Sequence, residues 1–202
     1  MSVPIWASDP ESLLITEEEY EALPEDVARS VEVVDGRVIF CESPTPEHQR
    51  VSLNLAWALK SARPAAPCLD VLQDTDMRYD YANAHVAETG RRFTLRRPDI
   101  TVLRCLEPGT RLTSASVLTV IEIVSTNSET DFNDKKAEYA AQRIPVYLIV
   151  VLAGARVHSI EEYRLDWSGR NYQLAAVHRD TLDVVLPKEL KLRVPFAELE
   201  RL

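Results

Sequence analysis

Two acidic residues stand in or beside strand-like apolar runs, where an apolar side chain would pack better. Asp99 directly precedes the run 100–103, and Glu122 lies within the run 117–124. The longer run is apolar on both alternating sides, which predicts a central strand covered on both faces. An ionised carboxylate in such a strand needs a cation or hydrogen-bond donors to replace its lost hydration. We therefore expect Glu122 to have a charged or polar partner.

Regular alternation along the run 117–124 predicts which side chains accompany Glu122. Leu118, Val120 and Val124 would share its side of the strand, and the other side would carry Val117, Thr119, Ile121 and Ile123.

The segment 128–143 supplies candidate partners for Glu122. It has capping residues at its start and Pro145 just past its end, which indicates a helix. Helical spacing places two lysines on the face of the aromatic residues, which comprises Phe132, Lys135, Lys136, Tyr139 and Arg143. A lysine on such a face can simply extend its stem along the core to solvent. The carboxylate just upstream favours a charged cluster instead, and helix geometry alone does not choose between Lys135 and Lys136.

Pro98-Asp99, then Glu122-Ile123-Val124, then a lysine resembles a degenerate PD-(D/E)XK nuclease signature in which Val124 occupies the lysine position. The chain is similar to the Uma2 family of restriction-endonuclease-like proteins, in which the lysine is displaced onto the following helix. The resemblance covers roughly residues 15–152. It is carried by the segments TEEEYEALPED, VEVVDGRVI, TPEHQRVSLNLAWAL, RRPDITVL, VIEIVS and IPVYLIVV, and by the spacing of Asp131, Lys135 and Tyr139.

The resemblance implies an endonuclease that hydrolyses phosphodiester bonds of DNA with a divalent metal ion. Oxygen ligands from Asp99, Glu122 and the backbone carbonyl of Ile123 suit Mg²⁺ or Mn²⁺. Such an ion would activate a bound water and stabilise charge on the phosphate. By resemblance, Lys135 would orient or deprotonate the attacking water, and Tyr139 would hold Lys135 in place.

Four further residues have both a structural and a functional interpretation. Glu32 is either the solvent-facing half of an alternating strand or, by resemblance, part of the acidic cluster. His48, in the first turn of a helix, is either a surface or capping residue or a substrate contact or support. Arg96 and Arg97 belong to a basic cluster with Arg91 and Arg92, which is either a solvated edge or a set of phosphate contacts.

The surrounding elements predict an α/β fold, a restriction-endonuclease-like mixed sheet flanked by helices. Asp35-Gly36 predicts a hairpin turn between strands 31–34 and 37–41, and Thr16 with Glu19 forms a capping box. The segment 46–61 reads as the longest helix, placed on the sheet face opposite the helix 128–143. Further strands are expected at 68–72, 76–81, 147–152, 156–165, 172–177 and 182–186, with an exposed loop at 83–92 and a terminal helix opened by Pro195.

Length and composition add several expectations. The 202 residues fit one domain, with residues 1–14 loosely ordered. The net charge of −9 argues against broad, non-specific nucleic-acid binding, because such binding depends on lysine and arginine. The three cysteines are expected to pack as core residues in a reducing cytosol. With no signal peptide or membrane span, we expect a cytoplasmic protein without membrane contact. The sequence leaves the oligomeric state open, a homodimer included.

The sequence leaves two alternatives to a nuclease open. The first is an inactive nuclease-like fold that serves as an interaction or regulatory module, with the acidic cluster merely structural. The second, a two-carboxylate glycosidase, fits poorly because it would need no lysine. No Gly-rich phosphate loop is present, which disfavours nucleotide hydrolysis of the P-loop type.

Overall fold

The structure of the protein is a computed structural model. It describes residues 13–41, 43–80, 93–125 and 129–202, with the backbone alone at 125 and 129–133. Most of the N-terminal segment 1–14 and the expected loop 83–92, with Arg91 and Arg92, therefore lie outside the described residues, as does the side chain of Asp131.

A six-stranded mixed sheet forms the centre of the fold, in the order β10-β9-β8-β7-β6-β3. Neighbouring strands run antiparallel except for β7 and β8, which are parallel and are joined through helix α5. The strands are β3 (Leu69–Gln73), β6 (Ile100–Arg104), β7 (Val117–Ser125), β8 (Val146–Ala153), β9 (Arg156–Leu165) and β10 (Tyr172–His178). The mixed sheet flanked by helices confirms the predicted fold class.

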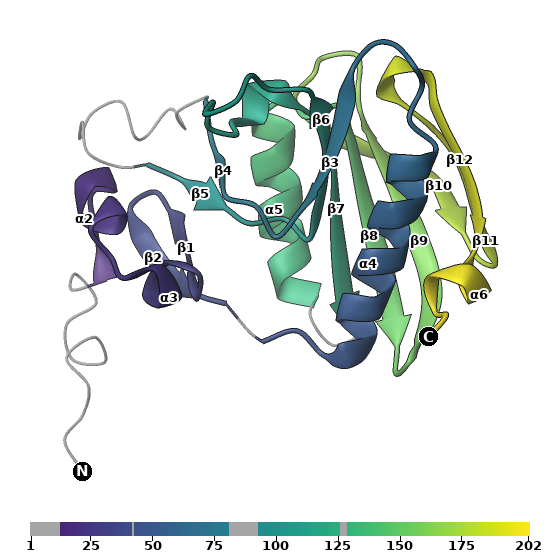
Figure 1. Cartoon of the computed structure of the whole chain (residues 1–202), viewed down its shortest axis with the longest axis horizontal. Coiled ribbons are helices and arrows are strands. Elements are labelled where there is room, and N and C mark those ends of the chain that lie inside the picture. Colours follow the sequence, from purple (N-terminus) through teal and green to yellow (C-terminus); the bar gives the residue numbers. More distant parts are fainter. Residues whose placement is uncertain (1–12, 42, 81–92, 126–128) are drawn as a thin grey trace.

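Two helices cover opposite faces of this sheet (Figure 1). Helix α4 (Pro46–Ser61) begins at Thr45, whose hydroxyl accepts a hydrogen bond from the amide of His48. Its buried side chains include Leu55 and Leu59, which belong to the larger apolar core. Helix α5 (Glu129–Ala141) packs Tyr139 and Ala140 into a second core on the other face. The expected placement of the two helices is confirmed.

A β-bulge alters the predicted alternation along β7. Leu103 pairs with Val117 while Val102 pairs with Thr119, so Leu118 is the extra residue. Leu118 therefore joins the core on the α4 side, and the expectation that it shares the side of Glu122 is wrong. Beyond the bulge the alternation holds, with Val120 in the core on the α5 side.

A second, four-stranded sheet lies beside the first, in the order β2-β1-β5-β4. The predicted hairpin is confirmed, with Asp35 and Gly36 both at positive φ in its turn. The Thr16 capping box at the start of α2 (Glu17–Glu21) is also confirmed. The strands are β1 (Val31–Val34), β2 (Arg37–Phe40), β4 (Met77–Arg78) and β5 (Leu95–Arg96), and a short helix α3 (Glu25–Ala28) precedes β1.

The C-terminal segment completes the core on the α4 side. Strands β11 (Thr181–Leu186) and β12 (Leu190–Pro195) pair antiparallel, and the predicted terminal helix follows as α6 (Phe196–Leu199). Burial alternates along β12, so that Leu190, Leu192 and Val194 face the core. Within the described residues, no helix is long and apolar enough to cross a membrane.

Two of the three cysteines form a disulfide, which corrects the expectation that all three are core thiols. Cys68 and Cys105 flank the paired strands β3 and β6, where Leu69 lies opposite Arg104. This register brings together residues that are 37 positions apart in the chain. Cys41 is free and exposed. Because disulfides are typical of oxidising compartments, the expected cytoplasmic location stays a prediction.

The disulfide should stabilise the fold by lowering the conformational entropy of the unfolded chain. For a closed loop of this length, chain entropy predicts a contribution of about 2–4 kcal/mol to the free energy of unfolding. We expect Cys68→Ala with Cys105→Ala to lower the denaturation midpoint, and a reductant to have no further effect on that variant. Cys41→Ala is the matched control and should denature like the wild type. Equal midpoints for all three proteins would contradict the prediction.

Candidate active site

A cleft of about 740 Å³ lies where the second sheet meets the main sheet and helix α4. Its lining includes Glu32 from β1, His48 from α4, Glu122 and Ile123 from β7, and Lys135 from α5, together with Asp99, which precedes β6. The sequence-predicted catalytic residues Asp99, Glu122 and Lys135 are thus brought together from the start of β6, from β7 and from α5.

Asp99 is held at the point where β6 begins. Its Oδ2 accepts a hydrogen bond from the backbone amide of Ile123 at 2.6 Å and lies 3.1 Å from His48 Nε2. Because β6 starts at Ile100, opposite Ile121, it offers no backbone partner to Ile123. In a strand the N–H and C=O of one residue point to the same edge, so the Ile123 carbonyl also faces the edge beside Asp99.

Glu122 is buried, with 5% of its surface exposed, and both of its oxygens have donors from α5. The hydroxyl of Tyr139 donates to Oε1 at 2.6 Å, and Lys135 Nζ lies 3.1 Å from Oε2. Burial raises the pKa of Glu122 to about 7, with further increases from Asp99 and Glu32 that Lys135 and Tyr139 only partly offset. The expected partner of Glu122 is therefore present.

Lys135, and not Lys136, reaches the carboxylates. Burial alone would lower the pKa of Lys135, but Glu122 and Glu32 raise it above its ordinary value. Lys135 is therefore a cation at neutral pH. Lys136 Nζ instead lies 3.9 Å from the ring centre of Tyr163 in β9, where it makes a cation–π contact.

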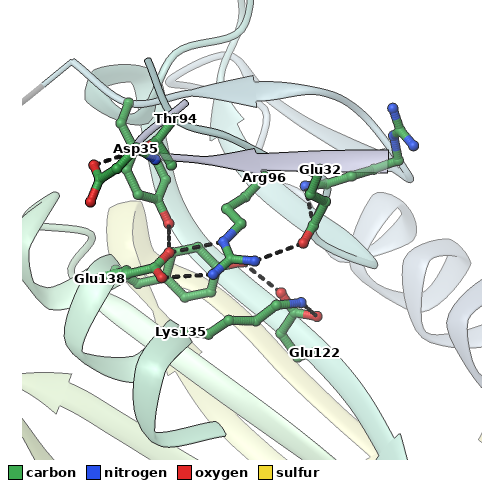
Figure 2. A network of polar contacts seen from close by, with 10 residues as sticks. Glu32, Asp35, Thr94, Arg96, Glu122, Lys135 and Glu138 are labelled. Atoms are coloured by element: carbon green, nitrogen blue, oxygen red, sulfur yellow. Dashed lines mark hydrogen bonds and ion pairs between the residues drawn. The ribbon is translucent and has the colours of Figure 1, made fainter. Parts of the chain in front are cut away.

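Glu32 faces the cleft and is 6% exposed, so its interpretation as a solvent-facing strand residue is wrong. Its Oε2 lies 2.8 Å from Arg96 Nη1, and its Oε1 accepts from the Arg97 amide at 2.7 Å. Burial favours the neutral acid, yet the cations Lys135 and Arg96 and these hydrogen bonds lower the pKa of Glu32. Figure 2 shows Glu32 and Arg96 above the pair of Glu122 and Lys135.

Arg96 and Arg97 belong to internal networks. Arg96 is 4% exposed and donates two hydrogen bonds to Glu138, at 2.6 and 2.9 Å, in addition to its contact with Glu32 (Figure 2). Arg97 donates to Asp76 at 2.8 Å and to the carbonyl of Ala28. Neither arginine forms the solvated edge that the sequence suggested, because their guanidinium groups already bind protein acceptors. Their proposed phosphate contacts stay a prediction, and the geometry gives both residues a structural role.

His48 supports Asp99 from the first turn of α4. Burial alone would lower the pKa of His48, but the hydrogen bond to Asp99 and the nearby carboxylates of Asp74 and Glu122 raise it. Its Nδ1 is buried and has no hydrogen-bond partner among the described residues. His48 is therefore placed to orient the Asp99 carboxylate.

Sequence reasoning missed two polar residues of the cleft. Asp74 follows β3, and its amide donates to the Asp99 carbonyl at 3.3 Å. Burial and the charge of Asp99 raise the pKa of Asp74. Tyr147 in β8 also lines the cleft, and its buried hydroxyl has no partner among the described residues. The polar stretch 73–75 directly after an expected strand was the available signal for Asp74, whereas the Tyr147 position depends on the parallel pairing of β7 and β8.

Comparisons with known proteins identify the family and the fold of the chain. The model of the Uma2 family, described as "Putative restriction endonuclease", matches residues 17–195. The chain belongs to the Uma2 family. The match extends past residue 152, where the resemblance ends, and includes all of the C-terminal strands β9 to β12. The crystal structure of "a putative nuclease belonging to DUF820" from Anabaena variabilis ATCC 29413 aligns with a TM-score of 0.66 and 16% identity, covering 92% of this chain and 97% of that chain. A search of curated proteins found no match.

The donor set in this Uma2 chain fits a hard, hydrated cation. In the part of the chain that the structure describes, no three His, Cys, Asp or Glu side chains converge as a metal site. Asp99, Glu122 and the Ile123 carbonyl would therefore leave about half of the coordination positions of an octahedral ion to water and substrate. This arrangement suits Mg²⁺, which keeps several waters and is commonly bound by one or two carboxylates. It does not suit zinc, which prefers a fuller set of nitrogen and sulfur ligands.

The raised pKa of Glu122 predicts how stability depends on pH. Because the folded protein binds this proton more tightly than the unfolded chain, stability should fall as pH rises from about 4.5 towards 7. The contribution is on the order of 1–3 kcal/mol. We expect denaturation of the wild type in EDTA to show this loss between pH 5 and pH 8. Glu122→Gln, which cannot ionise, should show a smaller loss. Identical pH dependence in the two proteins would argue against the assignment.

Proposed function

We propose that this protein is a metal-dependent endonuclease that hydrolyses phosphodiester bonds of DNA. The observation that carries the proposal is the convergence of Asp99, Glu122 and Lys135 on one cleft, with Lys135 at 3.1 Å from Glu122. Membership of the Uma2 family supports the nuclease class. The divalent metal ion is proposed from the oxygen ligands in the cleft, and the DNA substrate is proposed from the resemblance to restriction-endonuclease-like proteins.

Asp99, Glu122 and the backbone carbonyl of Ile123 would hold Mg²⁺ or Mn²⁺. When bound, the ion supplies a water of lowered pKa and a positive charge beside the phosphate. The chain positions these ligands through the backbone amide of Ile123 and through His48, which both contact Oδ2 of Asp99. The three ligands therefore arise from elements that the main sheet fixes relative to one another.

Lys135 acts as a cation in this proposal. Since its pKa is raised by Glu122 and Glu32, its amine is protonated and has no free electron pair to remove a proton from water. It can orient the attacking water and stabilise the negative charge that develops on the phosphate. Of the two roles expected by resemblance, orientation fits this geometry. The hydroxyl of Tyr139 donates to Oε1 of Glu122, while Lys135 contacts Oε2, so Tyr139 fixes the position of the carboxylate.

One observation favours the alternative of an inactive interaction module. The pair of Glu122 and Lys135, together with the Tyr139 hydroxyl, satisfies the buried carboxylate without any further ligand. A structural ion pair would need nothing more. The two hypotheses differ in whether the protein responds to divalent metal ions and cleaves nucleic acid.

Substitutions at the cleft should separate catalysis from folding. We expect Asp99→Ala, Glu122→Gln and Lys135→Ala each to reduce Mg²⁺- or Mn²⁺-dependent cleavage by at least 100-fold, since each removes a ligand or a transition-state contact. Lys136→Ala is the matched control on the same helix and should retain activity. The measurement is cleavage of labelled DNA, single-stranded and duplex, with circular dichroism to check folding. A wild type that cuts neither DNA nor RNA with either metal would favour the interaction module.

Metal binding can be tested without knowing the substrate. At 100 times its dissociation constant a ligand adds about 2.7 kcal/mol to stability, which raises the melting temperature by several degrees in a protein of this size. We expect Mn²⁺ at saturation to do so for the wild type relative to EDTA. Glu122→Gln should be at least as stable as the wild type in EDTA and should lose most of the shift. An equal shift in both proteins would place the metal elsewhere.

A further inference from the structure

The cleft has few positive charges left for a DNA backbone. Among the described residues, each cation that lines it already faces a carboxylate: Arg29 with Glu25, Arg96 with Glu32 and Glu138, Arg97 with Asp76, His48 with Asp99 and Lys135 with Glu122. Duplex binding draws most of its affinity from several unpaired cations that displace counterions. With a net charge of −9, this protein must obtain affinity in another way.

Apolar side chains at the rim of the cleft provide such a source. Ile39 and Phe40 of β2 line the cleft, and they are 37% and 62% exposed. Ile39 lies opposite Glu32 in the hairpin, so the rim adjoins the charged cluster. An exposed aromatic ring beside a nuclease-like site can stack an unpaired base, because every base has a flat face. In a duplex, that face is already stacked on the neighbouring base pair.

The depth of the carboxylates points to the same substrate. The side chains of Glu122 and Asp99 are only 7% and 15% exposed, so a reacting phosphate must enter the cleft to reach them. A flexible single strand can bend into such a space. A duplex is stiff over about 150 base pairs and keeps its phosphates on a broad cylinder.

A second hollow continues from the cleft along α4. This hollow, of about 510 Å³, shares Gln49 and Asp74 with the cleft and is also lined by Arg50 and Arg201. Among the described residues, neither guanidinium group has an acidic partner, in contrast to the arginines of the cleft itself. Phe40 lines the cleft that holds the carboxylates, and Arg50 lines the hollow that adjoins this cleft at Gln49 and Asp74. The cleft therefore offers a stacking surface, and the adjoining hollow offers an unpaired cation.

We propose that the site takes single-stranded DNA, with an unpaired base stacked on Phe40 in the cleft and a backbone phosphate at Arg50 in the adjoining hollow. This substrate class rests on the proposed nuclease function, because it is the reacting phosphate that must reach Asp99 and Glu122. Phe40 and Arg50 are binding residues and take no part in bond cleavage.

The test is fluorescence anisotropy with a labelled 12-nucleotide strand and the matching 12-base-pair duplex. Ca²⁺ replaces Mg²⁺, and gels confirm that the DNA stays uncut. We expect the single strand to bind at least tenfold more tightly than the duplex. Phe40→Ala should weaken single-strand binding roughly tenfold without changing its salt dependence. Phe40→Trp keeps an aromatic ring and should bind the single strand like the wild type. Arg50→Ala should reduce the slope of log affinity against log salt by about 0.7, the value for one lost phosphate contact.

Matched controls lie outside both hollows. Trp57→Ala removes another exposed ring, and Lys191→Ala removes another exposed cation, so both should bind like the wild type. Tighter duplex binding, or equal binding by Phe40→Ala and Trp57→Ala, would overturn the proposal. A parallel cleavage assay separates it from the nuclease function. Phe40-dependent binding without cleavage would reject only the nuclease, whereas cleavage that is independent of Phe40 would reject only the stacked single strand.

Discussion

The buried carboxylate of Glu122 is the constraint on which the arrangement of this protein depends. An ionised group in the middle of a covered strand is costly unless a cation and hydrogen-bond donors replace water. Lys135 and Tyr139 supply both from one helix, and they fix the rotation of α5 against the sheet. Lys135 is buried in turn and depends on Glu122 and Glu32 to remain charged. Replacing Lys135 by a neutral residue would therefore leave Glu122 and Glu32 without the cation that they share.

The same requirement extends into the second sheet. Glu32 on β1 is compensated by Arg96 as well as by Lys135, and Arg96 is in turn shared between Glu32 and Glu138 of α5. Tyr79 donates to Glu138 at 2.9 Å and completes the network. Charges therefore alternate from Glu122 through Lys135, Glu32 and Arg96 to Glu138. This alternation joins the two sheets through α5, so the second sheet is positioned by the charges that form the cleft.

Local patterns in the sequence predicted much of this structure, and the errors arise where distant segments meet. The hairpin at Asp35-Gly36 and helix α4 were predicted because turn geometry and helical periodicity are properties of residues close together in the chain. Glu122 needed a partner on burial grounds alone, although the choice of Lys135 required the family resemblance. The internal role of Arg96 was missed because its partners lie 64 and 42 residues away in the chain. Pairing between β3 and β6 brought Cys68 to Cys105, and no local pattern indicates that register.

The point where β6 begins explains why Asp99 and Glu122 differ in their readiness to bind a further ligand. Because β6 starts one residue after Asp99, the Asp99 carboxylate takes the place of a strand neighbour for Ile123, and only its Oδ2 is used. Its Oδ1 accepts no hydrogen bond from the described residues, and the Ile123 carbonyl shares that edge. Glu122 has donors on both oxygens. In the proposed metal site, a cation would therefore be met first by Asp99 and Ile123, and Glu122 would have to exchange a contact with Lys135 or Tyr139 to join them. Such an exchange would free Lys135 from part of its ion pair, so it would couple ligand binding at Asp99 to the orientation of the Lys135 cation.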